Sequence, residues 1–254
     1  MIDIARVELA AIAPLRDLYR RAMNCQIVHD SLHARGFTHQ YLIRAGGEIA
    51  GYGCVLGYEK DPKDIVKEFY VAPEHRRAAL TLFRTFVDAT GAKTIEAQTN
   101  DVLLTLLLLD CATEIQADKI LFRDEMTTRL SVPGATFRRT ANRDRPRLFD
   151  HRGEPQGDWL IEIDGAVAAT GGLLFHYNPP YGDVYMEVAE PFRRRGIGSY
   201  LVQELKRTCY EMGKVPAARC NAANTASRGT LQKAGMLPCA RILKATIARG
   251  THSP

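Results

Sequence analysis

The hydrophobic residues of this chain fall into helix-like stripes and short apolar runs that follow one another regularly. Apolar side chains recur at three- and four-residue spacing over residues 14–24, which predicts an amphipathic helix. Two apolar runs, at residues 41–44 and 49–56, flank Gly46 and Gly47 and predict a β-hairpin, because glycines permit the tight turn. Further strands are expected at residues 65–71, 93–98 and 119–123, and further helices at residues 80–90 and 102–111.

The second half of the chain repeats this order. Strands are expected at residues 159–163, 166–175, 184–188 and 216–220, and helices at residues 198–211 and 225–233. Residues 71–76 read VAPEHR, and residues 188–193, which lie 117 positions further along, read VAEPFR. A unit of this length encloses a core of its own, so we expect two similar domains, residues 1–134 and 135–254. The alternation of strands and helices predicts a mixed α/β (α+β) fold.

Residues 131–158, between the two halves, are rich in arginine, proline and glycine. This composition is typical of an exposed, solvated connection. The alternative is that the arginines of this segment form a cluster that binds an anionic partner. They are Arg138, Arg139, Arg143, Arg145, Arg147 and Arg152. The segment has room for one short strand and little of the helix that opens the first half. We therefore expect the second domain to borrow structure from the first half.

Composition places the chain among ordinary globular proteins, with 46% hydrophobic and 25% charged residues. The longest apolar run, residues 102–109, is well short of the ~20 residues that span a bilayer. Residues 1–13 lack the basic stretch, apolar stretch and cleavage site of a secretory signal, so a cytoplasmic location is expected. The six cysteines form no CxxC pair, which argues against a zinc ribbon and against a disulfide framework.

The net charge of +5 reflects 34 basic and 29 acidic residues. This mild excess suits an anionic ligand but is weak evidence for nucleic acid. The arginines of residues 138–147 also lack interleaved aromatic residues, apart from the nearby Phe137 and Phe149. Nucleic-acid binding is therefore not the expected function.

The most informative segment is residues 188–199, which read VAEPFRRRGIGS between a predicted strand and a predicted helix. Gly196 and Gly198 allow the backbone to approach a ligand closely. The amides that open the helix lie at its positive dipole end, and three arginines add bidentate donors. Together they predict a cradle for a pyrophosphate. The alternative is a glycine turn before a basic, solvated helix.

Two other phosphate motifs do not fit. A P-loop requires Gly-Lys-Ser/Thr after the glycines, and a dinucleotide fingerprint requires a small residue at position 201, which is leucine.

The pattern Arg193-x-x-Gly196-x-Gly198, followed by Asn224-x-x-Ser227 and by residues 233–236 (KAGM), resembles the GNAT superfamily of acyl-CoA-dependent N-acyltransferases. The resemblance implies two tandem domains, each with a mixed, splayed sheet flanked by helices. It also implies that the pantetheine arm of acetyl-CoA lies between strands 184–188 and 216–220. The residues that it assigns to acetyl-CoA are Val188, Arg193, Arg194, Arg195, Gly196, Ile197, Gly198, Ser199, Asn224 and Ser227. For Asn224, a purely helix-capping role is the alternative.

The sequence departs from the family at the catalytic acid. Many members carry a tyrosine late in the last helix, where this chain has Leu231. A base is also needed for the attacking amine, and Glu187 is the candidate, with Asp183 and His176 as alternatives. A solvent-facing strand residue is the other interpretation of Glu187, since strand side chains alternate between faces.

The first half keeps Arg76 but has Ala79 and Thr81 in place of the cradle glycines, and is interpreted as a degenerate copy. The predicted function is transfer of an acetyl group from acetyl-CoA to a primary amine by direct attack. The acceptor class remains open between small molecules and peptides, and a homo-oligomer is compatible with the sequence. A non-catalytic acyl-CoA-binding or sensor protein is the alternative.

A metal is not expected. His29 and His33 are four residues apart, with His39 beyond them, but no acidic or cysteine ligand completes the set at close spacing.

Overall fold

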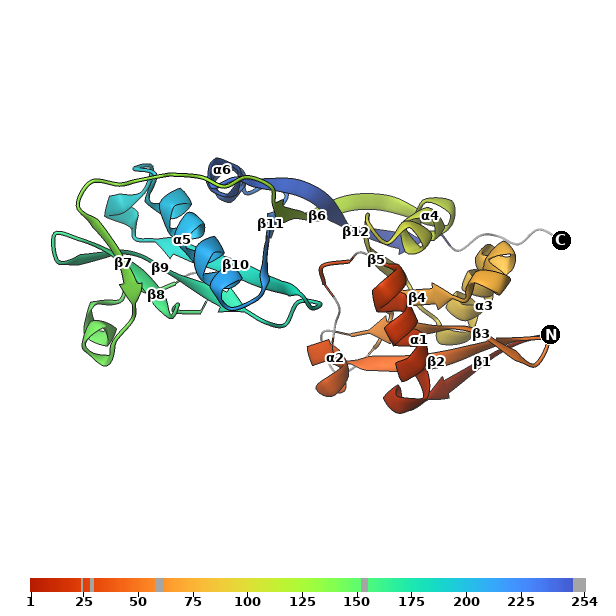
Figure 1. The fold of residues 1–254 in the computed structure, drawn as a ribbon. Coiled ribbons are helices and arrows are strands. Elements are labelled where there is room, and N and C mark those ends of the chain that lie inside the picture. Colours follow the sequence, from red (N-terminus) through yellow and green to blue (C-terminus); the bar gives the residue numbers. More distant parts are fainter. Residues whose placement is uncertain (24, 28–29, 58–61, 152–154, 249–254) are drawn as a thin grey trace. The chain divides into compact units, whose positions relative to one another are not determined.

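The computed structural model describes residues 1–23, 25–27, 30–57, 62–151 and 155–248 (Figure 1). The chain forms two compact units. Unit 1 comprises Met1–Asp118 and Ala240–Pro254, and unit 2 comprises Lys119–Cys239. The expected boundary between residues 134 and 135 divides the chain linearly, whereas these units are interleaved. No helix in the described residues is long and apolar enough to cross a membrane.

Unit 1 contains a mixed sheet in the order β1-β2-β3-β4-β5-β12. Its elements are β1 (Ile2–Val7), α1 (Leu9–Ala22), α2 (Asp30–Ala34), β2 (Thr38–Ala45), β3 (Glu48–Leu56), β4 (Ile65–Val71), a 3-10 helix (Pro73–Ala78), α3 (Ala79–Thr90), β5 (Thr94–Gln98), α4 (Val102–Cys111) and the second half of β12 (Met236–Ile247). All neighbours for which a register is given pair antiparallel except β4 and β5, which are parallel. The predicted strands and helices of this half are present, but β1 and α2 were not predicted.

Unit 2 repeats this plan in the order β6-β11-β10-β9-β8-β7. Its elements are the end of β6 (Ala112–Asp124), β7 (Ala135–Arg139), a 3-10 helix (Asn142–Arg147), β8 (Trp159–Ile163), β9 (Ala166–Leu174), β10 (Tyr181–Val188), a 3-10 helix (Glu190–Phe192), α5 (Ile197–Glu211), β11 (Val215–Asn221) and α6 (Thr225–Lys233). The parallel pair is β10 and β11, at the position of β4 and β5 in unit 1. The mixed α/β fold with a repeated sheet is confirmed.

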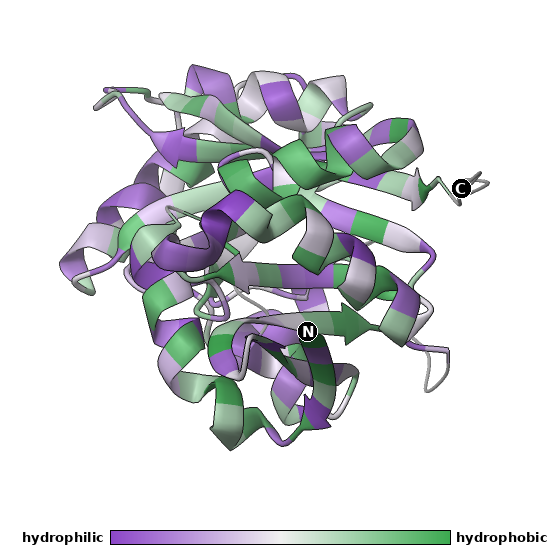
Figure 2. Ribbon diagram, turned by 90° about the vertical axis from the view of Figure 1, so that its right-hand side faces the viewer, coloured by the Kyte–Doolittle hydropathy of each residue, from purple (hydrophilic) through white to green (hydrophobic). Residues whose placement is uncertain are grey.

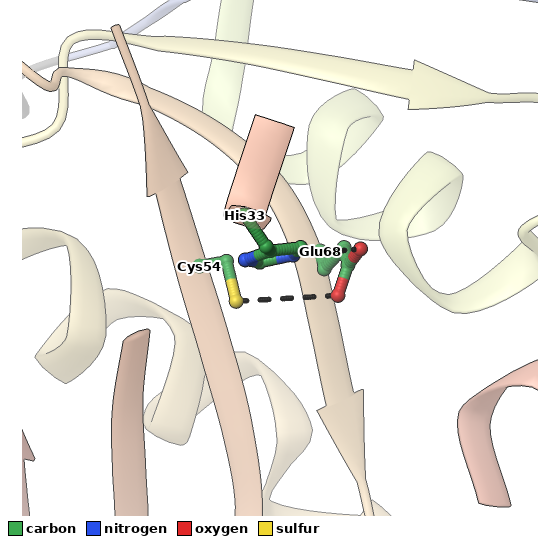
Figure 3. Close-up of side chains that lie close together, drawn as sticks. All are labelled: His33, Cys54 and Glu68. Atoms are coloured by element: carbon green, nitrogen blue, oxygen red, sulfur yellow. Dashed lines mark hydrogen bonds and ion pairs between the residues drawn. The ribbon is translucent and has the colours of Figure 1, made fainter. Parts of the chain in front are cut away.

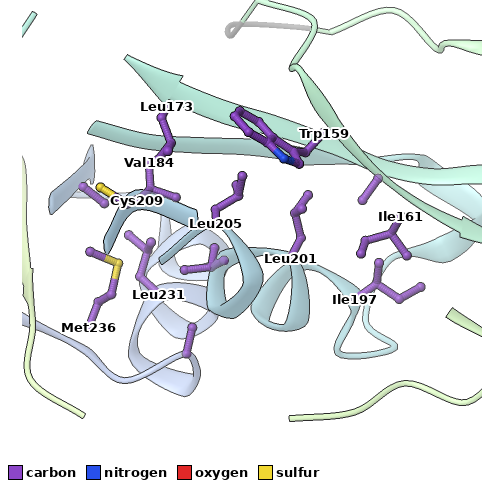
Figure 4. Close-up of a cluster of buried hydrophobic side chains, with 14 of the residues drawn as sticks. Trp159, Ile161, Leu173, Val184, Ile197, Leu201, Leu205, Cys209, Leu231 and Met236 are labelled. Carbon is purple, nitrogen blue, oxygen red and sulfur yellow. The ribbon is translucent and has the colours of Figure 1, made fainter. Parts of the chain in front are cut away.

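Each unit has its own hydrophobic core. In unit 2, Leu201, Val202 and Leu205 of α5 are fully buried against the sheet (Figure 4). In unit 1, Phe83 and Phe86 of α3 pack on Phe69 of β4, with ring centroids 5.0 Å and 5.5 Å apart. The banding of hydrophilic and hydrophobic residues along the helices in Figure 2 is the pattern expected of helices with one buried face.

Each sheet receives a strand from the connection that follows the other unit's last helix. Strand β6 follows α4, yet its residues 119–123 pair with β11 in unit 2. Strand β12 follows α6, yet its residues 242–246 pair with β5 in unit 1. Residues 119–134, assigned to the first domain on sequence, belong to unit 2, so the expectation that the second domain borrows from the first half is confirmed.

Most described residues of 131–158 are exposed, as expected, but the segment is more than a solvated connection. It contains β7 and a 3-10 helix built around Asp144, whose side chain is fully buried. Arg138 donates to both oxygens of this carboxylate at 2.6 and 2.7 Å, and Arg147 donates at 2.7 Å. A buried carboxylate requires charged partners, and these two arginines form ion pairs with Asp144 and with Glu162. Arg152 lies outside the described residues.

Candidate functional site

Strands β10 and β11 part after a short parallel contact. They pair only over Tyr181–Asp183 and Val215–Ala217, whereas β10 continues to pair with β9 as far as Val188. From residue 184 onward, the edge of β10 that faced β11 therefore no longer takes part in a ladder with that strand. The splayed sheet implied by the resemblance is present at this position.

The chain turns from β10 into α5 through a loop with a row of unbonded amides. Arg194 and Gly196 have left-handed φ values of +62° and +80°. The first helical hydrogen bond runs from the Tyr200 amide to the Gly196 carbonyl at 3.0 Å. Within the described chain, the backbone amides of residues 194–199 donate no hydrogen bond. Six consecutive free amides at the start of a 15-residue helix form a cradle for an anion.

The two glycines of the loop have different roles. Gly196 needs its left-handed backbone, and a Cβ there would approach only Lys233 Nζ, at 3.6 Å. A Cβ on Gly198 would lie 3.1 Å from Thr230 Cγ2 and 3.2 Å from Met186 Cε. Gly198 thus allows α5 to pack closely on β10 and α6. This packing role comes in addition to the predicted role of Gly198 at the cradle.

The three arginines also differ. Arg193 Nε donates to the Val188 carbonyl at 3.1 Å, so this side chain ties the loop back to the end of β10. Arg195 lies over the Phe192 ring, 5.4 Å from its centroid. Arg194 is exposed. Arg194 and Arg195 are therefore the residues of the triplet placed to face an anion in solution.

Other predicted residues of the cradle contribute backbone rather than side chains. Ile197 is buried in the core of unit 2. The Ser199 hydroxyl donates to the Thr230 carbonyl at 3.0 Å, which directs it toward α6.

Lys233 was not predicted as a site residue. It ends α6, and its ammonium lies beside Gly196 because α5 and α6 pack together. A basic residue in the last turn of a helix has no distinctive sequence signal, since it also complements the helix dipole. Only the packing of the two helices places this charge at the cradle.

Asn224 and Ser227 form the N-terminal cap of α6. Asn224 Oδ1 accepts a hydrogen bond from the Ser227 amide at 3.0 Å, which is the capping role considered for it. Leu231, the position of the tyrosine in many family members, is 6% exposed and belongs to the hydrophobic core (Figure 4). A leucine side chain at this position has no proton to donate.

Strand β10 presents different residues on its two faces. Val184, Met186 and Val188 pack with the α5 core, so Asp183, Tyr185 and Glu187 lie on the opposite face. The Glu187 side chain is 17% exposed and does not face solvent freely, which corrects the alternative interpretation. Its Oε2 lies 3.9 Å from Nδ1 of His151, a residue that the sequence did not indicate. Its Oε1 lies 4.0 Å from Arg193 Nη2.

The two alternative bases lie together near the point where the strands part. His176 Nε2 lies 3.5 Å from Asp183 Oδ2, and Arg219 Nε lies 3.7 Å from the same oxygen. Burial lowers the pKa of His176, and the nearby Arg219 guanidinium lowers it further. This face of β10 therefore carries two carboxylates, each beside an imidazole.

Unit 1 repeats the framework of the cradle. Its parallel strands pair only at Ile65–Thr94 and Val66–Ile95 before they part. Arg76 Nε donates to the Val71 carbonyl at 3.4 Å, as Arg193 does to Val188. This shared contact identifies the arginine as a structural element of both loops.

The cradle itself is absent from unit 1 as described. The 3-10 helix Pro73–Ala78 runs directly into α3, with Ala79 at a right-handed φ of −54°, so the loop amides bond within helical turns. A buried ion pair between Lys67 of β4 and Glu96 of β5 joins the parted strands. The N-caps Asp101 and Asn224 correspond between the repeats, which aligns Lys233 with Asp110, a residue of opposite charge.

A second cluster of polar side chains lies inside unit 1 (Figure 3). His33, Cys54 and Glu68 offer ligand atoms within 4.8 Å of one another. However, Arg16 donates two hydrogen bonds to Glu68 at 2.8 Å, and Tyr52 donates another at 3.0 Å. Burial would raise the pKa of Glu68, but hydrogen bonds from His33 and Arg16 lower it below the usual range.

These contacts do not suit a metal ion. The guanidinium already supplies the positive charge, and burial raises the pKa of the Cys54 thiol well above its usual value. The cluster is a satisfied polar core beneath α1 and α2. Of the other histidines considered, His39 lies on β2 and His29 lies outside the described residues.

Comparison with known proteins agrees with this geometry. Residues 123–236 match the family model described as the acetyltransferase (GNAT) family. No curated protein sequence matches the chain significantly.

Solved structures resemble the chain over its whole length. An acetyltransferase of the GNAT family from Colwellia psychrerythraea has a TM-score of 0.74 at 16% identity, covering 97% of this chain and 100% of that one. A tandem GNAT protein from the clavulanic acid biosynthesis pathway has a TM-score of 0.62 at 11% identity, covering 98% and 100%. A GCN5-related N-acetyltransferase from Sphaerobacter thermophilus has a TM-score of 0.59 at 16% identity, covering 98% and 96%.

At these identities the structural similarity shows the fold, and it covers both units. The family match falls within unit 2, where the strands part and the loop amides remain unbonded. Residues 123–236 therefore match the acetyltransferase (GNAT) family, and the whole chain has the fold of GNAT proteins, with two GNAT-like domains in tandem.

Proposed function

We propose that unit 2 binds one acetyl-CoA and transfers its acetyl group to a primary amine by direct attack. The observation that carries this proposal is the row of unbonded amides at residues 194–199, placed directly after the parted strand β10. A pyrophosphate needs several convergent donors, and consecutive amides at a helix start supply them without a side-chain entropy cost.

The donor would run along the free edge of β10. The pantetheine arm would bond to backbone groups from residue 184 to Val188, and the pyrophosphate would lie on the amides of residues 194–199. Arg194, Arg195 and Lys233 would supply positive charge. Asn224 Nδ2 and Ser227 Oγ make no hydrogen bond in the described chain, which leaves them as donors at the start of α6.

The reaction requires the acceptor amine to lose a proton. Its nitrogen attacks the thioester carbon, a C–N bond forms, and the C–S bond breaks with the electron pair leaving on sulfur. Glu187 is proposed as the base, because it lies on the face of β10 opposite α5. Since Leu231 is a core residue, the thiolate would take its proton from water.

Unit 1 is proposed to be a degenerate copy. Its loop amides are used within a 3-10 helix, and the Lys67–Glu96 ion pair occupies the position of the pantetheine arm. We therefore expect one acetyl-CoA per chain.

A non-catalytic acyl-CoA sensor is the second candidate, and the core position of Leu231 favours it. Acetyl-CoA binding followed by release of free thiol with a panel of amines distinguishes the two. An enzyme releases thiol in proportion to the acetylated amine, whereas a sensor binds without turnover.

Calorimetric titration with acetyl-CoA should give one site per chain. At 100 times the dissociation constant, a ligand that binds only the folded state stabilises it by about 2.7 kcal/mol, which differential scanning calorimetry detects as a rise in Tm. Free CoA should bind by the same cradle. Unchanged melting at millimolar acetyl-CoA would refute donor binding, and two equivalent sites would refute the degenerate status of unit 1.

Replacing Lys233 by glutamine should weaken acetyl-CoA binding about 10- to 150-fold, the range of one hydrogen bond to a charged group. The steepness of the salt dependence should fall as well, because one ion pair with phosphate is lost. Asp110→Asn changes the corresponding residue of unit 1 and should leave the affinity unchanged. Equal affinities of the wild type and Lys233→Gln would remove Lys233 from the site.

A further inference from the structure

His151 is a buried imidazole with one unbonded nitrogen. Its side chain is 3% exposed, and its ring stacks on Phe149 with centroids 5.0 Å apart. Nε2 forms a hydrogen bond with the Thr170 hydroxyl. Nδ1 is buried without a hydrogen-bond partner in the described chain. An unpaired buried polar atom costs roughly 1–3 kcal/mol, so a purely structural role leaves this nitrogen unexplained.

The fold aims Nδ1 at the proposed base. Thr170 of β9 lies directly opposite Glu187 of β10, so the imidazole bonded to Thr170 is brought beside the carboxylate. Nδ1 lies 3.9 Å from Glu187 Oε2, which is too long for a hydrogen bond. Arg193 Nη2 approaches the other oxygen, Oε1, at 4.0 Å. The two carboxylate oxygens therefore have different neighbours.

The spacing suits a donor held by both groups. In the tautomer that donates Nε2–H to Thr170, Nδ1 presents a lone pair, and Glu187 Oε2 presents another. Two acceptors 3.9 Å apart can both bond a single nitrogen at ordinary hydrogen-bond distance. A primary ammonium has three such donors, and the carboxylate complements its charge.

We infer that His151 Nδ1 and Glu187 Oε2 together bind the ammonium of the acceptor and take up its proton, an assignment that rests on the proposed acetyl transfer. The proton moves from the ammonium to this pair, and the free amine attacks the thioester carbon. The C–N bond forms as the C–S bond breaks, and the thiolate is protonated by water. His151 thus orients the amine while Glu187 supplies the negative charge.

Two variants separate the nitrogens of His151. Gln places its amide near Nε2 and keeps the Thr170 contact, whereas Asn places its amide near Nδ1. His151→Gln should retain its Tm and its acetyl-CoA affinity while kcat/KM for the amine falls about 100-fold. In His151→Asn, the KM for the amine should stay closer to the wild-type value than in His151→Gln. The reaction rate of His151→Asn should lose the pH dependence of the wild type. A His151→Gln enzyme with wild-type kcat/KM and pH profile would overturn the inference.

A second measurement does not depend on turnover. The side-chain nitrogens of His151 can be followed by NMR of protein labelled at histidine, with and without the amine panel, in the wild type and in Glu187→Gln. Among the described residues, the imidazole faces Glu187 from β10, Thr170 from β9 and Phe149 from its own segment. Because an ammonium held by both groups donates to Nδ1, a bound amine should shift the Nδ1 resonance of the wild type and leave that of Glu187→Gln unchanged.

The two measurements separate the two proposals. If no amine is acetylated yet an amine shifts the Nδ1 resonance in the wild type and not in Glu187→Gln, acetyl transfer fails and the pairing of His151 with Glu187 stands. If an amine is acetylated but leaves the Nδ1 resonance of the wild type unchanged, the pairing is refuted and acetyl transfer stands.

Discussion

Replacing Gly196 by aspartate is expected to abolish acetyl-CoA binding, with an affinity loss of at least about 100-fold. Gly196 holds a φ of +80°, and its amide is one of the six that open toward the anion. An aspartate adds a negative charge where the pyrophosphate would lie, and its carboxylate would pair with Lys233 Nζ, which lies beside this position. The cradle would then lose one cation as well as gain an anion. Calorimetric titration with acetyl-CoA measures the effect.

Gly213→Asp is the matched control for this variant. Gly213 follows α5 and has a similar φ of +69°, and a Cβ added there would have no atom within 4 Å. Both variants bear the same backbone strain, but only Gly196 lies at the cradle. Both should therefore lose similar stability, while Gly213→Asp should bind acetyl-CoA normally. Tight binding by a folded Gly196→Asp variant would show that the donor phosphates bind elsewhere.

Deleting residues 240–254 is expected to unfold unit 1. This segment pairs along β5 over residues 242–246 and buries Ile242, Ala245 and Ile247. Two buried isoleucines and a lost strand ladder amount to a loss on the order of 5 kcal/mol, comparable to the whole stability of many domains. The uncovered β5 would also expose an unpaired strand edge. Circular dichroism melts and dye binding by exposed apolar surface measure the loss.

Deleting residues 249–254 alone is the control, because this truncation leaves all of β12 in place. The Tm of this variant should equal that of the full chain. A chain ending at residue 239 that melts at the wild-type temperature would contradict the assignment of β12 to unit 1.

The two repeats differ in the backbone conformation of the loop between the parted strand and the following helix. Their sheets part at equivalent points, and an arginine bonds the end of the strand in both. In unit 2 the loop takes two left-handed residues and leaves its amides open, whereas in unit 1 alanines continue a 3-10 helix. The change from Gly196 to Ala79 accounts for one of the two left-handed positions that unit 1 lacks.

The sequence alone determined most elements and singled out the loop of residues 188–199. Strands 65–71 and 159–163 and helices 102–111 and 225–233 were predicted with the bounds that the structure has, because their hydrophobic patterns and capping residues are local. The open loop before α5 could be predicted for the same reason, since its glycines and the amides at the helix start lie within a few residues of one another. The internal repeat was visible for the same reason.

Only the tertiary structure decided the exchanged strands, the partners of the arginines in residues 131–158 and the positions of Lys233 and His151. Strand β12 was not predicted because its partner β5 is more than 140 positions away. The residues of a strand do not by themselves identify the strand with which it pairs. The partners of Arg138 and Arg147 were not predicted, because Asp144 becomes buried between them only in the folded chain. His151 and Glu187 stand 36 positions apart, and only the pairing of β9 with β10 brings their side chains to one place. Local chemistry is encoded within each segment, but which segments meet depends on packing that the chain achieves as a whole.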